Sequence, residues 1–388
     1  MKRDSNIVKC IFVLPDLSGG GAERVTIDLI KSLDRSKFQV SLFLLRKSGA
    51  YLSQIPLETK VYFGLETDGS ILKNAARIIK KLNATAKEND VIIGSLELIG
   101  HLFATIASIS SRKPNIAWLH KHLGYYLDAL PIHRKLIYKS MARSIYKKVN
   151  KIVAVSESSI NSVIELFPKY RNKSTYIYNP VDFERIIELS SMEMPDWFRI
   201  LQERQVPIVL AVGRLEFQKG FDLLISAFSN VKKRGYSGIL VILGEGGERQ
   251  ALTKRIKQLD LQNDIFLPGF ANPYPIMANC DLFVLSSRYE GLPTVLIEAL
   301  AFDLQIVSTD CPSGPKEILQ NLKSALLIRS EDIVEMEQAI ISKFTENKNI
   351  QESKVKSRHR FEKKNVSEKW EELILKVVKE NENSNYSE

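Results

Sequence analysis

A chain of 388 residues is too long for a single compact core, so we expect two domains. Hydrophobic residues make up 44% and charged residues 26%, which is ordinary for a soluble globular protein, and three widely spaced cysteines exclude a disulfide framework and fit a reducing cytoplasm. The first apolar stretch is interrupted by Lys9 and ended by Pro15, which is typical of a core strand rather than a signal peptide, and no apolar segment is long enough for a transmembrane helix.

Positive charge is concentrated in one part of the chain. The net charge is +10, and residues 71–150 carry 14 Lys and Arg against 4 Asp and Glu. Such an excess favours nucleic acid or an anionic membrane surface as a partner. Neither a zinc-finger spacing nor an aromatic RNA-recognition motif accompanies the charge, so we expect no nucleic-acid partner.

Short apolar runs alternate with amphipathic helical stretches along the chain. Helices are expected at 23–34 and 220–235, among others. The expected strands are residues 8–15, 38–45, 90–96, 115–120 and 151–156, and then 207–214, 238–246, 264–270, 280–287 and 304–310. This alternation predicts an α/β fold with parallel sheets covered by helices. Its restart near residue 206 predicts two Rossmann-like, doubly wound domains facing a cleft.

The last periodic stretch, "NVSEKWEELILKVVKE", is predicted to be a helix. Asn365, with Glu368 three residues later, marks its start. Its apolar face consists of Val366, Trp370, Leu373, Ile374 and Val377. The predicted divisions are residues 1–190, 191–362, a C-terminal helix at 363–380 and a disordered polar tail at 381–388.

A glycine-rich loop, "DLSGGGAERV", follows the first expected strand. Gly19, Gly20 and Gly21 either let the backbone approach a phosphate or substrate closely or simply pack strand against helix. The loop is not a dinucleotide-binding fingerprint, because Arg24 stands where the third glycine would be.

Two further strand ends carry polar candidates. In "AVGRLEFQKG", Arg214 and Lys219 either clamp a diphosphate or are solvated surface cations. In "AWLHKHLG", His120 and His122 are candidates for ligand contact, although a lone histidine is more often structural. The backbone N–H groups of residues 313–316, in "TDCPSGPKEIL", offer a place for an anion.

Two glutamates in "SSRYEGLPTVLIEALAF" raise a question of burial. Pro293 suits the first turn of a helix over 293–302, on which Glu298 has apolar neighbours. Glu298 is therefore either on a solvated helix face or bound to a ligand such as sugar hydroxyls, while Glu290 lies in the preceding loop. No Asp-x-Asp pair occurs, so we expect no carboxylate pair that holds a divalent metal.

Together these motifs resemble the retaining glycosyltransferases of family 4, which have the GT-B fold. The segment "EGLPTVLIE" is similar to the family's E-x7-E signature, and "GGGAERV", "VGRLEFQKG", "GEGGERQAL", "GF" at 269–270 and "SGPKEIL" follow in the family's order. The resemblance extends from about residue 7 to residue 377. The loop at 313–316 departs from the more usual Gly-Gly form, so its sugar and phosphate contacts are not carried over.

The resemblance implies roles for individual residues. The implied catalytic residues are His120 beside the reacting sugar, Arg214 and Lys219 on the diphosphate, and Glu290 near the 3- and 4-hydroxyls of the sugar. The implied donor-binding residues are Gly20, Gly21, Gly244, Gly246, Phe270, Leu292, Pro293, Thr294 and Glu298, the last on the ribose hydroxyls. No metal ligand is implied, and no cofactor other than the nucleotide-sugar co-substrate.

The resemblance also implies a function. The N-terminal domain would bind the acceptor, the C-terminal domain the nucleotide sugar, and the C-terminal helix would pack back on the N-terminal domain. The expected reaction moves a hexose or N-acetylhexosamine, with retention, from a UDP-linked donor to a glycan or lipid-linked glycan in cell-surface polysaccharide or lipopolysaccharide synthesis. The alternatives are a GT-B epimerase or phosphorylase and a non-catalytic nucleotide-sugar-binding protein.

The basic segment "LPIHRKLIYKSMARSIYKKV" bears on where such an enzyme works. Lys135, Lys139 and Arg143 are spaced by four and so line one side of a helix. This helix either packs its apolar side on the N-terminal sheet or meets anionic lipid. We expect a cytoplasmic enzyme that is peripheral at the inner face of the membrane.

Overall fold

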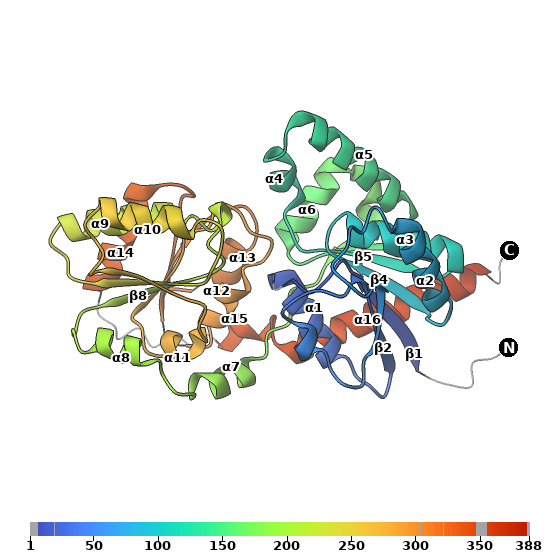
Figure 1. Ribbon diagram of the computed structural model, residues 1–388, viewed down its shortest axis with the longest axis horizontal. Helices are drawn as coiled ribbons and strands as arrows, with labels where there is room; N and C mark the ends of the chain where they lie inside the picture. Colours follow the sequence, from blue (N-terminus) through green and yellow to red (C-terminus); the bar gives the residue numbers. More distant parts are fainter. Residues whose placement is uncertain (1–6, 19, 303, 321, 347–354, 386–388) are drawn as a thin grey trace. The chain divides into compact units, whose positions relative to one another are not determined.

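The computed structural model describes residues 7–18, 20–302, 304–320, 322–346 and 355–385, and the chain divides into two compact units (Figure 1). Unit 1 contains the chain up to Pro180 and again from Lys363, and unit 2 is Val181–Glu362. Gly19 of the predicted glycine loop lies outside the described residues.

Unit 1 is built on a parallel sheet of seven strands. Their order across the sheet is β3-β2-β1-β4-β5-β6-β7. The strands are β1 (Val8–Leu14), β2 (Phe38–Arg46), β3 (Lys60–Leu65), β4 (Val91–Ser95), β5 (Asn115–Leu119), β6 (Lys151–Ala154) and β7 (Ser174–Tyr176). Because β1 pairs with both β2 and β4, the chain winds outward from the middle in both directions, as a doubly wound sheet does.

Helices cover this sheet and complete unit 1. They are α1 (Gly21–Ser32), α2 (Ala75–Lys87), α3 (Ile99–Ser111), α4 (Leu123–Asp128), α5 (Ile132–Lys148), α6 (Glu157–Leu166) and α16 (Lys363–Asn385), with short 3-10 turns at Leu52–Gln54 and Pro168–Lys173. Helix α16 returns to unit 1 as predicted, and the ring of Trp370 lies 4.7 Å from that of Trp118. The carboxylate of Glu371 accepts the backbone N–H of Asp34 at 2.9 Å.

One sequence-based boundary is corrected at this end. Helix α16 begins at Lys363, the start of the predicted helix at 363–380, but it continues to Asn385 through most of the predicted disordered tail 381–388. Extending an existing helix adds one hydrogen bond per residue fixed, so polar residues such as Glu380 and Glu382 join it although they bury little. Residues 386–388 lie outside the described residues.

The division between the units lies at residue 180, earlier than the predicted boundary at residue 190. Helix α7 (Phe183–Ser190) belongs to unit 2 because it packs against α11 (Pro273–Met277), where the Asn272 side chain donates to the carbonyl of Leu189 at 3.2 Å. The N–H of Val181 also donates to the carbonyl of Phe361 at 2.8 Å, within the same unit. These contacts could not be deduced from the polar character of the segment.

Unit 2 repeats the architecture with six parallel strands. Their order is β10-β9-β8-β11-β12-β13. The strands are β8 (Ile208–Val212), β9 (Ile239–Leu243), β10 (Ile265–Gly269), β11 (Leu282–Leu285), β12 (Gln305–Thr309) and β13 (Ala325–Ile328). The remaining helices are α8 (Asp196–Gln202), α9 (Phe221–Lys233), α10 (Arg249–Gln258), α12 (Thr294–Ala299), α13 (Pro315–Leu319), α14 (Ile333–Thr345) and α15 (Val355–His359), with a 3-10 turn, η3, at Phe217–Lys219.

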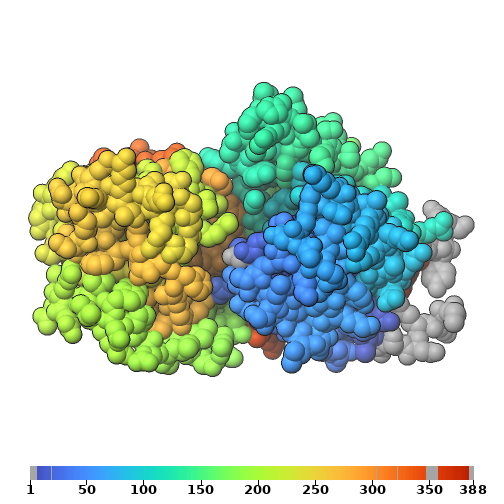
Figure 2. Space-filling view, viewed as in Figure 1, coloured from blue at the N-terminus to red at the C-terminus, as the bar shows by residue number. Residues whose placement is uncertain are grey.

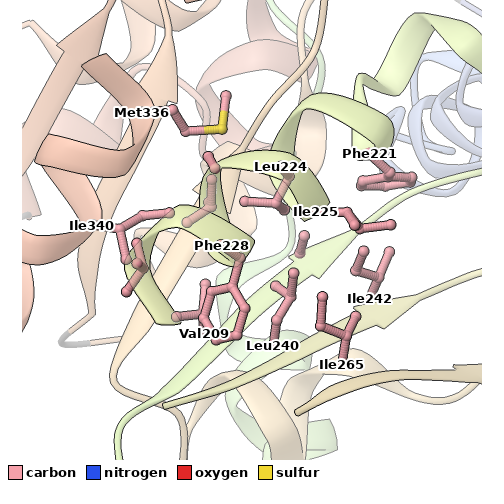
Figure 3. Close-up of a cluster of buried hydrophobic side chains, with 14 of the residues drawn as sticks. Val209, Phe221, Leu224, Ile225, Phe228, Leu240, Ile242, Ile265, Met336 and Ile340 are labelled. Atoms are coloured by element: carbon pink, nitrogen blue, oxygen red, sulfur yellow. The ribbon is translucent and has the colours of Figure 1, made fainter. Parts of the chain in front are cut away.

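An apolar cluster of unit 2 packs around β8, the strand that leads to the site. Figure 3 shows side chains of α9, such as Phe228, lying over strand residues such as Val209 and Leu240, with Ile340 of α14 beside them. All four are fully buried. Shortening one of the aliphatic residues to Ala in such a core typically costs about 2–5 kcal/mol.

Helix α5 exposes an apolar and cationic surface on unit 1. Its inner side, including Tyr138 and Tyr146, is buried in the unit, so the expected packing on the sheet is present. On the outer side, Ile132, Leu136 and Ile137 are 70%, 61% and 59% exposed. Figure 2 shows this segment, in the green-teal colours of residues 132–148, at the surface.

The cations of α5 are not equally available. Lys135 is half-buried and pairs with Asp128 at 2.5 Å, whereas Arg134, Arg143 and the last two lysines of the helix are exposed. The spacing predicted three free cations in a line at 135, 139 and 143, but Lys135 and Lys139 are half-buried and only Arg143 is exposed. Across the described parts of the chain, no helix is both long and apolar enough to cross a membrane.

Candidate active site

The polar residues of unit 2 gather where its strand order reverses. Strands β8 and β11 are neighbours in the sheet, although β9 and β10 lie between them in sequence. Lys219 follows β8 and Glu290 follows β11, and the Lys219 Nζ lies 2.6 Å from the Glu290 Oε1. Ligands of doubly wound sheets bind at this point. The structure thus brings together two residues that the sequence placed far apart.

The Glu290 carboxylate is buried and held by three donors. It is 6% exposed. Besides Lys219, the Ser287 hydroxyl donates to the Oε1 at 2.6 Å and the Gln218 Nε2 donates to the Oε2 at 3.3 Å. Sequence reasoning missed Ser287 and Gln218, although each stands within three residues of a predicted site residue.

Close backbone packing positions Lys219. Gly220 has a φ of +62°, and a Cβ there would lie 2.1 Å from the carbonyl oxygen of Ser286. The Ser286 hydroxyl donates to the carbonyl of Lys219 at 2.8 Å. The turn after β8 is therefore fixed against the loop after β11, which limits where the Lys219 ammonium group can lie.

Arg288 reinforces the same junction and was not singled out from the sequence. Its guanidinium group bonds to both carboxylate oxygens of Asp222, at 2.8 and 2.7 Å, and to Glu331 at 2.9 Å. It lies 3.9 Å from the centre of the Phe217 ring. The hydrogen bonds to Asp222 raise the pKa of Arg288 above its ordinary value, so this residue stays charged. Since η3 begins at Phe217, the network ties Lys219's turn to Glu290's loop.

Arg214, the second predicted cation, is in a different situation. It is exposed near the start of the turn after β8, and no ion pair joins it to another described residue. The two expected clamp residues therefore differ. Lys219 is held by Glu290, and Arg214 projects from the protein surface.

The glycines at 244 and 246 permit close approach of two loops. Gly244 has a φ of +140°, and a Cβ on it would lie 1.9 Å from the carbonyl oxygen of Gly213; one on Gly246 would lie 2.4 Å from that of Leu215. Packing alone explains these glycines, whatever a ligand does there. Phe270, after β10, is 89% exposed, so its ring is available for stacking.

Glu298 is not on a solvated helix face. Helix α12 is shorter than the expected 293–302, and Glu298 on it is only 3% exposed. Leu292 and Pro293, just before the helix, are also buried, and Thr294 is half-buried. The solvated-face hypothesis is wrong because the helix buries four consecutive residues, Leu296 to Ala299, with Glu298 among them.

The loop at 313–316 packs against the segment that precedes α12. Ser313 donates its hydroxyl to the carbonyl of Gly291 at 2.5 Å. Gly314 has a φ of +97°, and a Cβ there would lie 2.4 Å from the Pro293 Cδ. The glycine is thus needed for this contact.

In unit 1, His120 lies just beyond β5 and contacts the end of β4. Its Nε2 is 2.8 Å from the Ser95 hydroxyl, which is 3.0 Å from the hydroxyl of Thr26 on α1. Gly20 caps α1 and Gly21 is its first residue, so the start of that helix follows the glycine loop. The predicted residues of unit 1 thus lie together at the carboxyl ends of β1, β4 and β5.

Glu97 holds the backbone of His120 and was also missed from the sequence. Its Oε1 accepts the N–H groups of His120 and Lys121, at 2.5 and 2.7 Å. Burial alone would raise the pKa of Glu97, but the nearby positive charge of Lys121 holds it below its ordinary value. Burial also lowers the pKa of His120 from 6.5 to about 4, so its ring is neutral at pH 7.

His122 has a structural role in the unit. Its Nδ1 accepts the N–H of Tyr125 at 3.3 Å and so caps α4. Within the residues that the structure describes, no group of three or more His, Cys, Asp or Glu is arranged to hold a metal ion.

Comparison with known proteins gives two family matches. Residues 19–185 match the model for Glycosyltransferase Family 4, and residues 194–367 match that for Glycosyl transferases group 1. These two segments cover most of the chain.

Individual relatives agree with the family matches. An uncharacterized glycosyltransferase of Methanocaldococcus jannaschii is 30% identical over 64% of this chain, and the match covers 62% of that relative. The N-acetylgalactosamine-N,N'-diacetylbacillosaminyl-diphospho-undecaprenol 4-alpha-N-acetylgalactosaminyltransferase of Campylobacter jejuni is 28% identical over 86% of this chain and 89% of its own length.

The fold has a close counterpart among solved structures. Anabaena HepE, solved in complex with UDP and glucose, superposes with a TM-score of 0.78 over 95% of this chain and 99% of its own, at 22% identity. This similarity confirms the predicted GT-B class of two Rossmann-like domains. With the two family matches, it leads to one conclusion: the chain is an enzyme of the group 1, family 4 glycosyltransferases.

Proposed function

We propose that this glycosyltransferase moves a hexose or N-acetylhexosamine from a UDP-linked donor to a lipid-linked glycan, with retention of configuration. The observation that carries the proposal is the Lys219–Glu290 pair at the strand-order reversal of unit 2. Support for the donor comes from HepE, which was solved with UDP and glucose, and support for the acceptor from the Campylobacter relative, whose name includes an undecaprenol-linked sugar.

The residue chemistry suits departure of a diphosphate. As the bond to the sugar breaks, negative charge grows on the diphosphate, and Arg214 and Lys219 would stabilise it. Lys219 now neutralises Glu290, so a bound donor would divide this pair: the diphosphate would take the ammonium group, and sugar hydroxyls would donate to the carboxylate. Ser287 and Gln218 keep Glu290 partly satisfied during that exchange.

Glu298 and Phe270 would hold the nucleoside. A buried carboxylate is a good acceptor for the two ribose hydroxyls, and an exposed aromatic ring suits stacking on a base. We propose that the acceptor attacks from the face that the diphosphate leaves, with a phosphate oxygen taking the acceptor's proton. Cationic side chains would then stabilise the departing diphosphate, and no metal ion would be needed.

We further propose that the enzyme works at the cytoplasmic face of a membrane and contacts it through α5. Exposed Ile132, Leu136 and Ile137 supply apolar groups, and neighbouring Arg134 and Arg143 supply charge. Cations near an anionic bilayer contribute about 1 kcal/mol each, and buried apolar groups add to this.

A donor screen tests the reaction. Purified enzyme is mixed with UDP-glucose, UDP-galactose, UDP-N-acetylglucosamine or UDP-N-acetylgalactosamine, and both the melting temperature and the release of UDP are measured, with a lipid-linked acceptor where release is slow. At least one donor should stabilise the protein and release UDP. Stabilisation without release or transfer under any condition would favour the non-catalytic alternative, and interconversion of two donors would favour an epimerase.

Vesicle sedimentation tests the membrane proposal. The wild-type chain should sediment with anionic vesicles at low salt, and the variant Ile132→Ser/Leu136→Ser/Ile137→Ser should not. The matched control is Ile200→Ser, since Ile200 is 59% exposed on α8 of unit 2. Equal sedimentation of the triple variant and the control would refute a role for the α5 surface.

A further inference from the structure

Three polar contacts run in sequence from α1 to His120. The Thr26 hydroxyl lies 2.9 Å from the carbonyl oxygen of Ala22, the Ser95 hydroxyl lies 3.0 Å from that of Thr26, and the His120 Nε2 lies 2.8 Å from Ser95. Thr26 and Ser95 are fully buried. Each contact is short enough that it needs a hydrogen between the two heavy atoms.

Counting hydrogens leaves one arrangement. A carbonyl has no hydrogen to give, so Thr26 must donate to Ala22. Its hydroxyl then serves as the acceptor for Ser95, which gives its only hydrogen to Thr26. Ser95 in turn can only accept from the ring, so the hydrogen between Ser95 and His120 must be on the Nε2. The reverse direction would leave two oxygen lone pairs facing each other at 2.9 Å, between Thr26 and Ala22.

This arrangement determines the other ring nitrogen. A neutral imidazole carries one hydrogen, and burial keeps His120 neutral at pH 7 because its pKa is about 4. With the hydrogen on the Nε2, the Nδ1 has a lone pair and can only accept. The Nδ1 is buried and has no hydrogen-bond partner. An unsatisfied buried acceptor is unfavourable, so a ligand group that donates a hydrogen bond to the Nδ1 would be stabilised.

We propose that Thr26 and Ser95 are positioning residues that hold His120 in its Nε2–H form, so that the Nδ1 accepts a hydroxyl of the transferred sugar and rejects a carboxylate. The sugar's presence beside His120 is the role that the family resemblance implies for this residue, and it rests on the proposed function. Because the Nδ1 is covered without ligand, the surrounding atoms must move when the donor binds. The substrate class is thus an uncharged hexose or N-acetylhexosamine rather than a hexuronate.

The ring form is measured by nitrogen NMR on the full chain labelled at its five histidines. His120→Gln identifies the His120 signals. Wild type and Thr26→Ser should show a protonated Nε2 and an unprotonated Nδ1. Thr26→Val removes the acceptor for Ser95, whose hydroxyl then turns to the Nε2, so the Nδ1–H form should appear. Ser95→Ala serves as a second variant, in which both forms should be populated.

Donor binding measures the consequence. The ratio of dissociation constants for a UDP-hexuronate and the UDP-hexose of the same configuration is determined by calorimetry. Compared with Thr26→Ser, Thr26→Val should lower this ratio about tenfold, the size expected for one hydrogen bond to a charged group. Adding the UDP-hexose to wild type should also shift the Nδ1 signal.

The outcomes separate the two proposals. An Nδ1–H ring in the wild-type chain, or the same ring form in Thr26→Val as in Thr26→Ser, would overturn the positioning role even if transfer is normal. The expected ring forms in a protein that neither binds nor transfers any nucleotide sugar would refute the proposed function, and with it the ligand assigned to the Nδ1.

Discussion

Replacing Lys219 by Ala removes the ammonium group 2.6 Å from the Glu290 carboxylate, whereas replacing Arg214 removes an exposed cation. Both residues are proposed to serve the diphosphate, so both variants should lose most transfer activity. They should differ sharply in stability, because only Lys219 neutralises a buried carboxylate.

The burial of the pair sets the size of this difference. Removing one partner of a buried ion pair costs about 3–5 kcal/mol. Glu290 is 6% exposed but keeps Ser287 and Gln218 as neutral donors, and the Lys219 side chain is 18% exposed, so we expect the lower end, about 3 kcal/mol. Arg214→Ala should change stability by no more than about 0.5 kcal/mol. Adding Glu290→Gln to Lys219→Ala should restore about 1–2 kcal/mol, because an amide tolerates burial without a cation.

Hydrogen–deuterium exchange is the suitable assay, since a chain of two units need not unfold in one step. Peptides from β8 and β11 report the opening of unit 2, and peptides from β1 and β4 of unit 1 provide an internal reference. Faster exchange in β8 and β11 is expected for Lys219→Ala alone. If β8 and β11 exchange at the same rate in Lys219→Ala and Arg214→Ala, the Lys219–Glu290 pair does not stabilise unit 2 and the reasoning from burial is wrong.

Three other outcomes are expected. Glu298→Ala should weaken binding of UDP about tenfold or more in calorimetry, while Glu290→Ala should mainly lower turnover; unchanged UDP affinity in Glu298→Ala would remove the ribose assignment. Transfer should persist in excess chelator, and its loss there followed by recovery with magnesium or manganese would contradict the metal-independent proposal. The pKa of His120 is about 4 in the folded chain against an ordinary 6.5, so the unfolded chain binds more protons between these values and unit 1 should lose stability as the pH falls from about 6.5 to about 4. Hydrogen–deuterium exchange of β4, measured over this pH range in wild type and His120→Gln, checks this. Equal pH dependence in both chains would exclude His120 as the source.

The sequence predicted most of the sheets but missed three strands. The runs that became β8 and β11 are continuous and apolar, as expected of central strands buried on both faces. Strands β3, β7 and β13 lie at or near sheet edges, where burial is partial and the apolar signal is weak. Their pairing depends on a neighbour far away in sequence, which periodicity alone cannot detect.

The types and positions of the main site residues could be predicted from the sequence, but the side chains that they contact could not. Lys219 and His120 were found because each follows a strand that ends where ligands of doubly wound sheets bind, and Glu290 because its segment resembles the E-x7-E signature. Their mutual contacts depend on strand order, which no local pattern specifies. Ser95 illustrates the limit: it ends an expected strand, yet only the adjacency of β4 and β5 reveals that its hydroxyl meets His120.

The two-part construction of unit 1 has a consequence for synthesis on the ribosome. Residues 363–385, which form α16, are translated only after all of unit 2, yet Trp370 packs on Trp118 of β5. Unit 2 can therefore bury its core while unit 1 still has an uncovered aromatic surface. During that interval Trp118 is a place where a nascent chain can aggregate or bind a chaperone. A nascent chain stalled after Glu362 has left the ribosome, but before α16 has, should hold unit 2 folded and unit 1 open to protease.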